Sequence, residues 1–484
     1  MNNTKKEEKI WITCSDCKGL GKKSKKVSKK SRLRYQIAVE QFDKSNGNLN
    51  IPVRPIGQLY SCKCCDGSGL QLSEKLPISD NNYPNVAIIG GGIAGVALAV
   101  ACFHRGIPFT LYERDSNFNT RSQGYGLTLQ QASKAMKEFG ILSLKDAVIS
   151  TKHIVHTSDG KIIGEWGMRK WLDPNSKTNS KRTNIHIPRQ SLRLALLEQL
   201  HTNNAINWNH QLVDFKESED QGVTLNFLVN GESKTVNADL VVGADGIRSA
   251  VRKLLISEEI SPLRYLGCMV ILGICNLDAL EGIESNLLDS ATVFQTANGI
   301  ERIYMMPYTS DTIMWQLSFP ISEEKAIALN KQGTKALKEE ACRRTQWHNP
   351  IPQILLATLE TQISGYPVYD RELLLPELLE KGKQITLIGD AAHPMSPFKG
   401  QGANQALLDA LALARGISKG CKPSSQWKET GIRKSVLTAF ESEMLKRSAS
   451  KVTDSADAAE FLHTEVALFE GNETRGSWIK KSKE

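Results

Sequence analysis

Short apolar runs that end at glycine or at an acidic residue are the first pattern in the sequence. Residues 85–89 are apolar and rich in β-branched side chains, which predicts a buried parallel strand. The glycine-rich stretch 90–95 follows at once, and residues 96–105 predict a helix. The apolar runs 238–242 and 385–388 predict two further buried strands. Together these segments indicate an α/β fold with a parallel sheet.

A different pattern fills residues 259–371, where apolar runs are short and alternate with polar positions. Such alternation predicts antiparallel strands, which we place at residues 265–275, 291–296, 301–307 and 312–319. Beyond residue 424 the pattern becomes helical, with the best segments at 436–445 and 454–468. The sequence therefore predicts a Rossmann-like domain interrupted by an antiparallel β-sheet domain and followed by a helical tail.

The segment 90–95 has the spacing G-x-G-x-x-G between a predicted strand and a predicted helix. Gly90 permits the tight turn, Gly92 lets the backbone approach a pyrophosphate, and Gly95 lets the helix pack close to the strand. Glu113 ends the next predicted strand, near the spacing expected of a carboxylate that binds the adenosine ribose, and Arg114 beside it is a further cofactor candidate. NAD and FAD share this fingerprint, so it does not choose between them.

Three later motifs carry a family resemblance. Residues 238–252 contain the pattern D-G-x-x-S-x-x-R, which begins at Asp245. Residues 385–404 read ITLIGDAAHPMSPFKGQGAN, and residues 188–192 read PRQSL. These motifs resemble those of class A FAD-dependent monooxygenases, the aromatic-hydroxylase or salicylate-hydroxylase-like family, over about residues 84–465.

The resemblance implies which residues contact FAD. Asp390 would accept a hydrogen bond from a ribityl hydroxyl, and the helix that begins after residue 402 would direct its positive end at the flavin. The alternatives are a structural turn for Asp245 and surface ion pairs for Arg121 and Arg189. The implied contacts are, in chain order, Arg121, Gly126, Leu127, Arg189, Asp245, Asp390, Pro397, Gly400, Gln401, Gly402, Ala403 and Asn404.

The resemblance also divides the chain into domains. Residues 84–258 and 372–422 would form the FAD-binding domain, residues 259–371 the substrate-binding sheet, and residues 423–484 a helical region. By strand alternation, the candidate residues that line the substrate pocket are Phe294, Tyr304, Met306 and Gln316. The alternative for each is ordinary core or solvent. No group of acid–base residues is evident, so the catalytic residues stay unknown, and the wholly apolar run 267–275 suggests a larger or more apolar substrate.

The resemblance implies a reaction in which NADPH or NADH reduces FAD, O₂ adds to the flavin C4a carbon, and the hydroperoxide transfers one oxygen atom to an aromatic or polycyclic small molecule. A reductase or oxidase that inserts no oxygen is the first alternative. The second is a zinc-containing interaction protein whose flavin fold is inactive.

The amino-terminal 83 residues have a different composition. The whole chain has a net charge of +9, and residues 1–83 hold most of that excess of Lys and Arg. Residues 22–34 form a Lys-rich run, which predicts a solvated, flexible loop. The alternative is a surface that contacts nucleic acid, an acidic protein or a membrane. Residues 76–84 are predicted to be a linker.

Two copies of C-x-x-C-x-G-x-G occur in this region, at residues 14–21 and 62–69. Thiolates two residues apart can bind one metal ion from a tight turn, and four sulfurs suit a closed tetrahedral zinc site. The doubled motif resembles the zinc-binding region of DnaJ-type chaperones. The predicted ligands are Cys14, Cys17, Cys62 and Cys65, with Cys64 as a possible substitute. A redox pair or unligated thiols are the alternatives.

The sequence shows no signal peptide, because its first 13 residues lack an apolar core. The apolar run 86–103 is interrupted by glycines and does not indicate a membrane span. The remaining cysteines show no disulfide pattern, and we therefore expect a cytoplasmic protein.

Overall fold

The computed structural model describes residues 9–45, 52–55, 57–120, 125–167, 184–202, 204–218, 222–422, 424–474 and 476. The chain forms two compact units. One contains Met1–Ile78 and His104–Gly106, and the other contains Ser79–Phe103 and Ile107–Glu484.

The smaller unit consists of two antiparallel strand pairs and one helix. Strand β1 (Ile10–Thr13) pairs with β4 (Leu70–Ser73), and β2 (Lys22–Ser24) pairs with β3 (Leu59–Ser61). Helix α1 (Lys29–Lys44) buries no side chain.

The prediction of a flexible loop over residues 22–34 is wrong for much of that stretch, because β2 and the first residues of α1 occupy it. Ser28 caps α1 by accepting a hydrogen bond from the Ser31 N–H at 3.1 Å, and Lys and Arg are good helix formers. Positive charge alone therefore did not indicate a loop.

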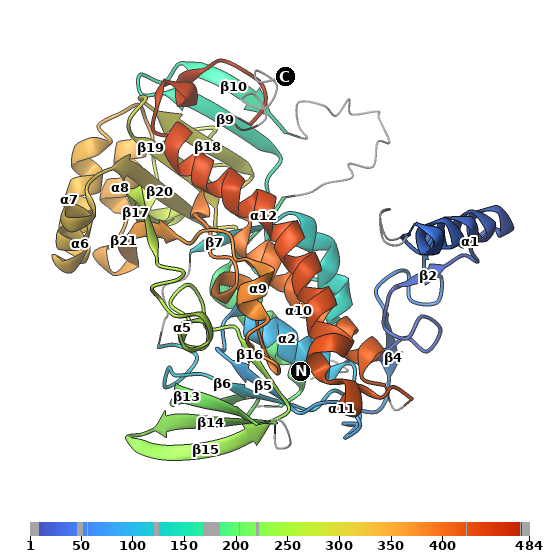
Figure 1. Cartoon of the computed structure of the whole chain (residues 1–484). Coiled ribbons are helices and arrows are strands. Elements are labelled where there is room, and N and C mark those ends of the chain that lie inside the picture. Colours follow the sequence, from blue (N-terminus) through green and yellow to red (C-terminus); the bar gives the residue numbers. More distant parts are fainter. Residues whose placement is uncertain are drawn as a thin grey trace, which may run out of the picture. The chain divides into compact units, whose positions relative to one another are not determined.

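The larger unit is built on a five-stranded parallel sheet. Its strand order is β12 (Ile206–Asn207), β6 (Phe109–Tyr112), β5 (Val86–Ile89), β16 (Leu240–Gly243) and β22 (Ile385–Leu387). Every residue of β5, β16 and β22 is buried, as expected for parallel strands covered on both faces. Helices α2 (Ile93–Phe103) and α10 (Gly402–Gly420) pack against each other beside this sheet (Figure 1).

A seven-stranded sheet forms the second layer of the larger unit. Its order is β10 (Ile162–Trp166), β9 (Lys152–Thr157), β18 (Thr292–Ala297), β19 (Arg302–Pro307), β20 (Thr312–Pro320), β17 (Arg264–Asn276) and β21 (Ile363–Asp370). The four strands predicted between residues 265 and 319 are all present. Two corrections follow, because β9 and β10 precede residue 259 and β9 pairs with β18 in parallel. The sheet therefore begins before the predicted domain boundary, and it is mixed rather than purely antiparallel.

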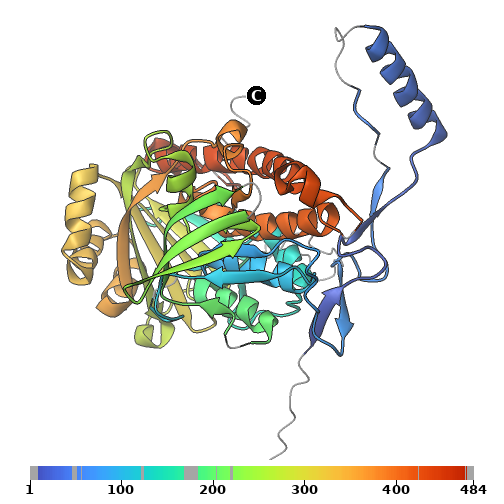
Figure 2. The ribbon, with the colours of Figure 1, turned by 60° about the horizontal axis from the view of Figure 1, so that its bottom comes forward.

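The two faces of the seven-stranded sheet have different neighbours. One face packs its apolar side chains against α6 (Glu323–Lys331), α7 (Thr334–Arg344) and α8 (Ile351–Ala357), which Figure 2 shows together beside the strands. Trp315 is the largest side chain of that core, and it donates a hydrogen bond to Thr358 Oγ1 at 2.9 Å. Helix α12 (Thr438–Phe461) packs against β17 and against α10.

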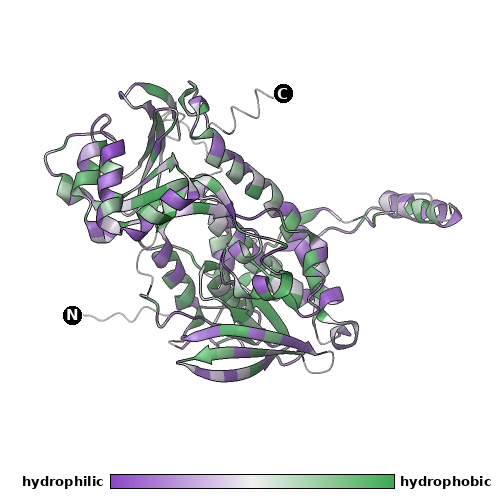
Figure 3. Ribbon diagram, turned by 60° about the vertical axis from the view of Figure 1, so that its left-hand side comes forward, coloured by the Kyte–Doolittle hydropathy of each residue, from purple (hydrophilic) through white to green (hydrophobic). Residues whose placement is uncertain are grey.

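The remaining elements complete the larger unit. A three-stranded antiparallel sheet alternates hydrophobic and hydrophilic positions along its strands (Figure 3), since it is covered on one face only. Its strands are β13 (His210–Ser218), β14 (Gly222–Val229) and β15 (Glu232–Ala238). The other strands and helices are β7 (Gly126–Leu129), β8 (Val148–Ile149), β11 (Ile185–Pro188), α4 (Arg189–Leu197), α5 (Ala250–Ile256), α9 (Pro376–Leu379) and α11 (Trp427–Thr430). In the part of the chain that the structure describes, every helix is too short or too polar to cross a membrane.

Candidate functional site

The glycine-rich turn after β5 brings three backbone segments into close contact. Gly90 has φ +108°, and a Cβ there would lie 2.5 Å from the carbonyl oxygen of Ala244. A Cβ on Gly95 would lie 1.9 Å from the carbonyl oxygen of Gly90, so only glycine lets α2 approach the strand this closely. At Gly92 the nearest atom to a Cβ would be Arg189 Nη2 at 3.7 Å. Gly92 thus leaves room above the first turn of α2, where a helix N-terminus binds phosphate.

Charged side chains flank this turn. Glu113 accepts hydrogen bonds from the N–H groups of Gly91 at 2.8 Å and Asp115 at 3.0 Å, which fix its carboxylate beside the glycines. Arg189 is the first residue of α4. Arg193, one turn later, donates from Nε to the carbonyl oxygen of Gly91 at 2.7 Å. We did not predict a role for Arg193, whose only sequence signal is its place one turn after Arg189.

Asp245 holds the start of a helix. Its carboxylate accepts hydrogen bonds from the Ser249 hydroxyl, from Ala250 N at 2.7 Å and from Val251 N at 3.3 Å, at the N-terminus of α5. Burial raises the pKa of Asp245 and these hydrogen bonds oppose the rise. The contacts support the structural-turn alternative, in which Asp245 positions the loop beside the cleft.

The last residue of the D-G-x-x-S-x-x-R motif crosses to the second fingerprint. Arg252 is buried, and its Nη1 donates to the carbonyl oxygens of Ala391 at 2.9 Å and Ala392 at 2.8 Å. Its Nη2 donates to Ser261 Oγ at 2.6 Å. The two motifs are thereby joined through one guanidinium.

Asp390 lies where the second fingerprint turns away from β22. Gly389 adopts φ +58°, and Asp390 faces open space next to Gly402, the first residue of α10. Burial raises the pKa of Asp390, and the charges of His393 and Arg189 oppose this rise. A carboxylate here can accept hydrogen bonds from a polyol chain. The first turn of α10 has no side-chain cap and offers free N–H groups to the same space.

Asn404 lies in the first turn of α10. Its side chain is fully buried, and Oδ1 accepts from Gln130 N at 2.9 Å and Ala132 N at 3.1 Å. Its Nδ2 donates to the carbonyl oxygens of Thr128 at 2.8 Å and Gly400 at 2.9 Å. The amide therefore has its full set of partners within the chain. Through its side chain Asn404 joins the α10 turn to β7, and contact of this residue with a cofactor stays a prediction.

Two cavities meet at this edge of the sheet. A cleft of about 230 Å³ follows the glycine turn, and a cavity of about 1700 Å³ lies between the seven-stranded sheet, the loop 394–403 and α12. Six residues line both cavities, namely Tyr125, Leu127, Arg248, Asp390, Gly402 and Ala403. The two spaces are therefore parts of one site.

Most of the predicted cofactor residues line this combined site. The cleft is lined by Gly90, Gly92, Glu113, Arg114, Arg189 and Asp245, the cavity by Gly126, Pro397, Gly400 and Gln401, and both by Leu127, Asp390, Gly402 and Ala403. Gly95 and Asn404 line neither space, and their contacts within the chain serve helix packing and loop geometry. Arg121 lies outside the described residues. Contact of these residues with the cofactor stays a prediction.

Three of the four predicted substrate residues face the large cavity: Tyr304, Met306 and Gln316. Phe294 does not, since it is fully buried in the core beneath α6–α8, and its neighbours Val293 and Gln295 line the cavity in its place. Sheet register gives the reason, because Tyr304 is paired with Gln295 and with Gln316. Alternation correctly predicted that every second residue of β18 faces the cavity, but it assigned the wrong set of alternate residues to that face.

A buried ionic network lies behind Asp390. Asp409 on α10 accepts from His393 Nε2 at 2.7 Å, from Gly389 N at 2.8 Å and from Arg447 Nη2 at 2.8 Å. Burial alone would lower the pKa of His393, but the Asp409 carboxylate raises it overall. Burial would raise the pKa of Asp409, but His393 and Arg447 lower it overall. The network connects α12, α10 and the second fingerprint.

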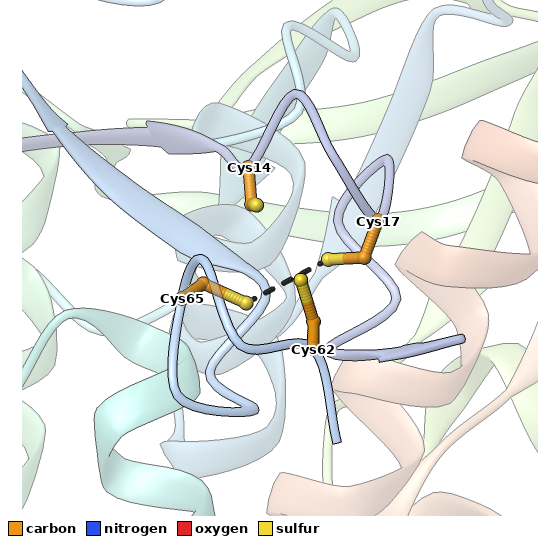
Figure 4. Close-up of side chains that lie close together, drawn as sticks. All are labelled: Cys14, Cys17, Cys62 and Cys65. Atoms are coloured by element: carbon orange, nitrogen blue, oxygen red, sulfur yellow. Dashed lines mark hydrogen bonds between the residues drawn. The ribbon is translucent and has the colours of Figure 1, made fainter. Parts of the chain in front are cut away.

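The smaller unit contains a cluster of four buried cysteines (Figure 4). The sulfurs of Cys14, Cys17, Cys62 and Cys65 all lie within 4.8 Å of one another, and Cys17 Sγ is 3.7 Å from Cys65 Sγ. The Gly21 N–H donates to Cys17 Sγ and the Gly69 N–H to Cys65 Sγ, each at 3.2 Å. Cys64 is exposed and lies outside this set of four.

Comparison with known proteins identifies the larger unit. The FAD binding domain family matches residues 83–426. Aurachin C monooxygenase/isomerase of Stigmatella aurantiaca is 31% identical over 335 residues, which cover 69% of this chain and 80% of that protein. A 3-amino-4-hydroxybenzoate 2-monooxygenase of Streptomyces platensis is 28% identical over 344 residues, which cover 69% and 79%. The fold is similar to that of Klebsiella pneumoniae HpxO, solved with FAD and uric acid, with a TM-score of 0.63, 17% identity, and coverage of 84% of this chain and 94% of HpxO.

The chain therefore belongs to the FAD binding domain family and to its class A flavin monooxygenases. The protein is an enzyme, an oxidoreductase of the FAD-dependent monooxygenase type. This leaves the interpretation as an inactive flavin fold without support.

Two glycine substitutions separate packing from cofactor binding. Gly95→Ala should destabilise the protein by about 1–3 kcal/mol, because the methyl group overlaps the Gly90 carbonyl. Gly92→Ala should leave the stability of the FAD-free protein within about 1 kcal/mol of wild type, because its methyl group meets open space, yet it should weaken FAD binding. Urea unfolding without FAD and flavin titration measure the two effects. Equal losses of stability would contradict the assignment.

Asp409→Asn should cost about 3 kcal/mol of stability, because it removes one partner from a buried ionic network. Because the folded state raises the pKa of His393, its imidazolium stabilises the fold fully at pH values below the pKa of unfolded histidine. This stabilisation declines as the pH rises through the folded-state pKa of His393. Because the pKa of Asp409 is lowered, its carboxylate stays charged and continues to stabilise the network until the pH is strongly acid. The difference between wild type and variant should therefore be largest near pH 5–6 and shrink as pH rises.

Urea unfolding at intervals from pH 5 to pH 9 measures this difference. Asp457→Asn is the control, since Asp457 is an exposed acid on α12. A difference that grows with pH would contradict the ion-pair assignment.

Proposed function

We propose that the enzyme uses NADPH or NADH and O₂ to hydroxylate an aromatic or polycyclic small molecule. The observation that carries this proposal is the cavity of about 1700 Å³ that joins the dinucleotide cleft at Asp390, Gly402 and Ala403. Such a cavity is larger than most small-molecule pockets, so it has room for a flavin ring and for a substrate of several fused rings.

The residues of the site fit FAD. Gly92 leaves open space at the N-terminus of α2 for a pyrophosphate, Glu113 lies beside the glycine turn, where we expect the adenosine ribose, and Asp390 faces the junction of the two cavities. When bound, FAD supplies acceptance of a hydride from the nicotinamide and activation of O₂. The chain's own task is then to orient the substrate and to exclude water.

The walls of the cavity suit a planar ring system. His153 and Trp166 stack with ring centroids 5.5 Å apart and planes inclined by 3°. Burial lowers the pKa of His153 to about 4, so this imidazole is neutral at physiological pH. Burial also raises the pKa of Tyr304 to about 12, so its phenol stays protonated and can donate a hydrogen bond. Neutral aromatic walls offer stacking surfaces to an aromatic substrate.

The relatives support the same substrate class. Aurachin C monooxygenase/isomerase is named for aurachin C, and the Streptomyces enzyme for 3-amino-4-hydroxybenzoate. We extend to this chain the class of substrate and not either compound.

A flavoprotein reductase or oxidase on the same fold would consume NAD(P)H without inserting oxygen. A screen of aromatic compounds for stimulated NAD(P)H oxidation should find substrates, and ¹⁸O₂ should place one labelled oxygen atom in each product molecule. Mass spectrometry of the product measures the label, and the same reaction in ¹⁸O water with ordinary O₂ is the control. Product without label from ¹⁸O₂ would favour the reductase or oxidase.

We further propose that the four-cysteine cluster binds one zinc ion. A Zn–S distance of about 2.3 Å in a tetrahedron places sulfurs about 3.8 Å apart, and Cys17 Sγ and Cys65 Sγ are 3.7 Å apart. All four cysteines are buried and free of disulfides, as a closed metal site requires. Contact of the Lys-rich stretch 22–34 with an acidic protein or nucleic acid, and a cytoplasmic location, stay predictions.

Cys65→Ser should reduce bound zinc from one ion per chain to well below one, because three thiolates and a hydroxyl bind zinc more weakly. Cys64→Ser is the matched control, and it should retain one ion because Cys64 is exposed and outside the cluster. Metal analysis of the purified variants by mass spectrometry makes the measurement. Full zinc in Cys65→Ser, or loss in Cys64→Ser, would contradict this ligand set.

A further inference from the structure

Arg302 is a buried cation on the cavity face of the seven-stranded sheet. It begins β19, its side chain is 6% exposed, and it lines the large cavity. Among the residues that the structure describes, no carboxylate lies within ion-pair distance of its guanidinium. A buried charge without a partner is costly, so its presence needs an explanation.

The hydrogen bonds of Arg302 account for part of its donor capacity. A guanidinium carries five N–H donors. Gln295 Oε1 accepts from Nε at 2.9 Å and from Nη2 at 2.7 Å. Nη1 makes no hydrogen bond within the described part of the chain, so the edge formed by Nη1 and Nη2 stays open. That edge is one of the two on which arginine binds a carboxylate through parallel hydrogen bonds.

The neighbours of Arg302 do not neutralise it. The guanidinium lies 5.2 Å from the centroid of the Tyr304 ring, whose phenol is protonated. His463 lies nearby, and burial lowers the pKa of this histidine to about 4, so it is neutral. Burial lowers the pKa of Arg302 only to about 10, so it remains charged at neutral pH. The cavity therefore contains a fixed positive charge.

Other buried arginines show what a structural role looks like in this protein. Arg252 donates to two backbone carbonyls and a serine hydroxyl. Arg371 lies 2.9 Å from a carboxylate oxygen of Glu258 and also donates to Ser261 O. Neither residue lines the large cavity. Arg302 differs from both because one atom, Gln295 Oε1, accepts all of its hydrogen bonds and because its side chain lines the cavity.

We propose that Arg302, held in orientation by Gln295, binds a carboxylate on the substrate, so that the substrate is an aromatic acid. The inference deepens the proposed hydroxylation and rests on it for the aromatic part of the molecule. It also replaces the expectation of an apolar substrate that came from the run 267–275. That strand, β17, does lack a basic group in its central part, but the cation enters from β19, two strands along the sheet.

The test is binding to the full-length, FAD-loaded enzyme without NAD(P)H, followed by changes in flavin absorbance. The probes are two matched pairs, benzoate with benzamide and 1-naphthoate with 1-naphthamide. Each acid should bind about 10- to 100-fold more tightly than its amide, as expected for a charge-assisted hydrogen bond in a buried site. Arg302→Gln should abolish this preference. A wild-type enzyme that binds acids no more tightly than amides overturns the proposal.

Gln295→Glu provides a test that does not require the Arg302→Gln variant to fold. Its carboxylate would sit where Gln295 Oε1 now accepts two hydrogen bonds, and so would pair with Arg302 inside the protein. This variant should retain FAD, unfold at a temperature at least as high as wild type, and lose the acid preference. An undiminished preference for acids in Gln295→Glu overturns the proposal.

Lys331→Gln is the control for general electrostatics. Lys331 is an exposed cation at the end of α6 and lines the same cavity. Its replacement should leave the acid preference within about twofold of wild type, and an effect as large as that of Arg302→Gln overturns the proposal. The binding test is also independent of catalytic turnover, so failure of the acid subsite and failure of the proposed hydroxylation can be told apart. Arg302-dependent acid binding without ¹⁸O in any product would refute hydroxylation alone, whereas labelled product only from uncharged aromatics would refute the acid subsite alone.

Discussion

The whole site depends on backbone packed against backbone at the carboxyl edge of the five-stranded sheet. A side chain at Gly95 would overlap the Gly90 carbonyl, and one at Gly90 would overlap Ala244. Because these contacts leave no space for a Cβ, α2 begins directly above the sheet. Its first residues line the same cleft as those of α10, so two helix N-termini converge on one place. An anionic cofactor is the natural occupant of such a place.

Buried polar side chains then fix the loops around that edge. Asp245 holds the start of α5, Arg252 binds the backbone after Asp390, and Asn404 joins the start of α10 to β7. Asp409 secures the same loop from behind. The carboxylates of Asp245 and Asp409 and the amide of Asn404 have their hydrogen bonds satisfied inside the protein, as buried polar groups require, and Arg252 uses both of its Nη atoms. Most residues of the sequence fingerprints thus line the open space of the site, whereas Arg252, Asn404 and Asp409 shape the loops around it.

The sequence predicted the elements that are determined by residues close together along the chain. Strands β5, β6, β16 and β22 and the glycine turn follow from local apolar runs and fixed spacing. The pairing of β9 with β18 joins residues more than a hundred positions apart, and no local pattern reports it. Phe294 was misplaced because alternation gives a period without a phase, and phase is set by the partner strand. Arg302 was missed for a related reason, since its significance is that none of the described carboxylates lies within ion-pair distance of it.

The cysteine cluster is assembled from two short segments that bind each other reciprocally. Cys14 N donates to Gly69 O at 2.8 Å, and Cys62 N donates to Gly21 O at 2.9 Å. Everything needed for the cluster therefore lies within residues 10–24 and 59–73. Among the described residues of the chain between them, Lys25 N donates to Gln58 O at 2.9 Å beside the β2–β3 pair, and closing the loop costs entropy that rises slowly with loop length. That intervening segment, α1 included, is consequently a place where evolution can lengthen, shorten or replace sequence while the cluster stays intact.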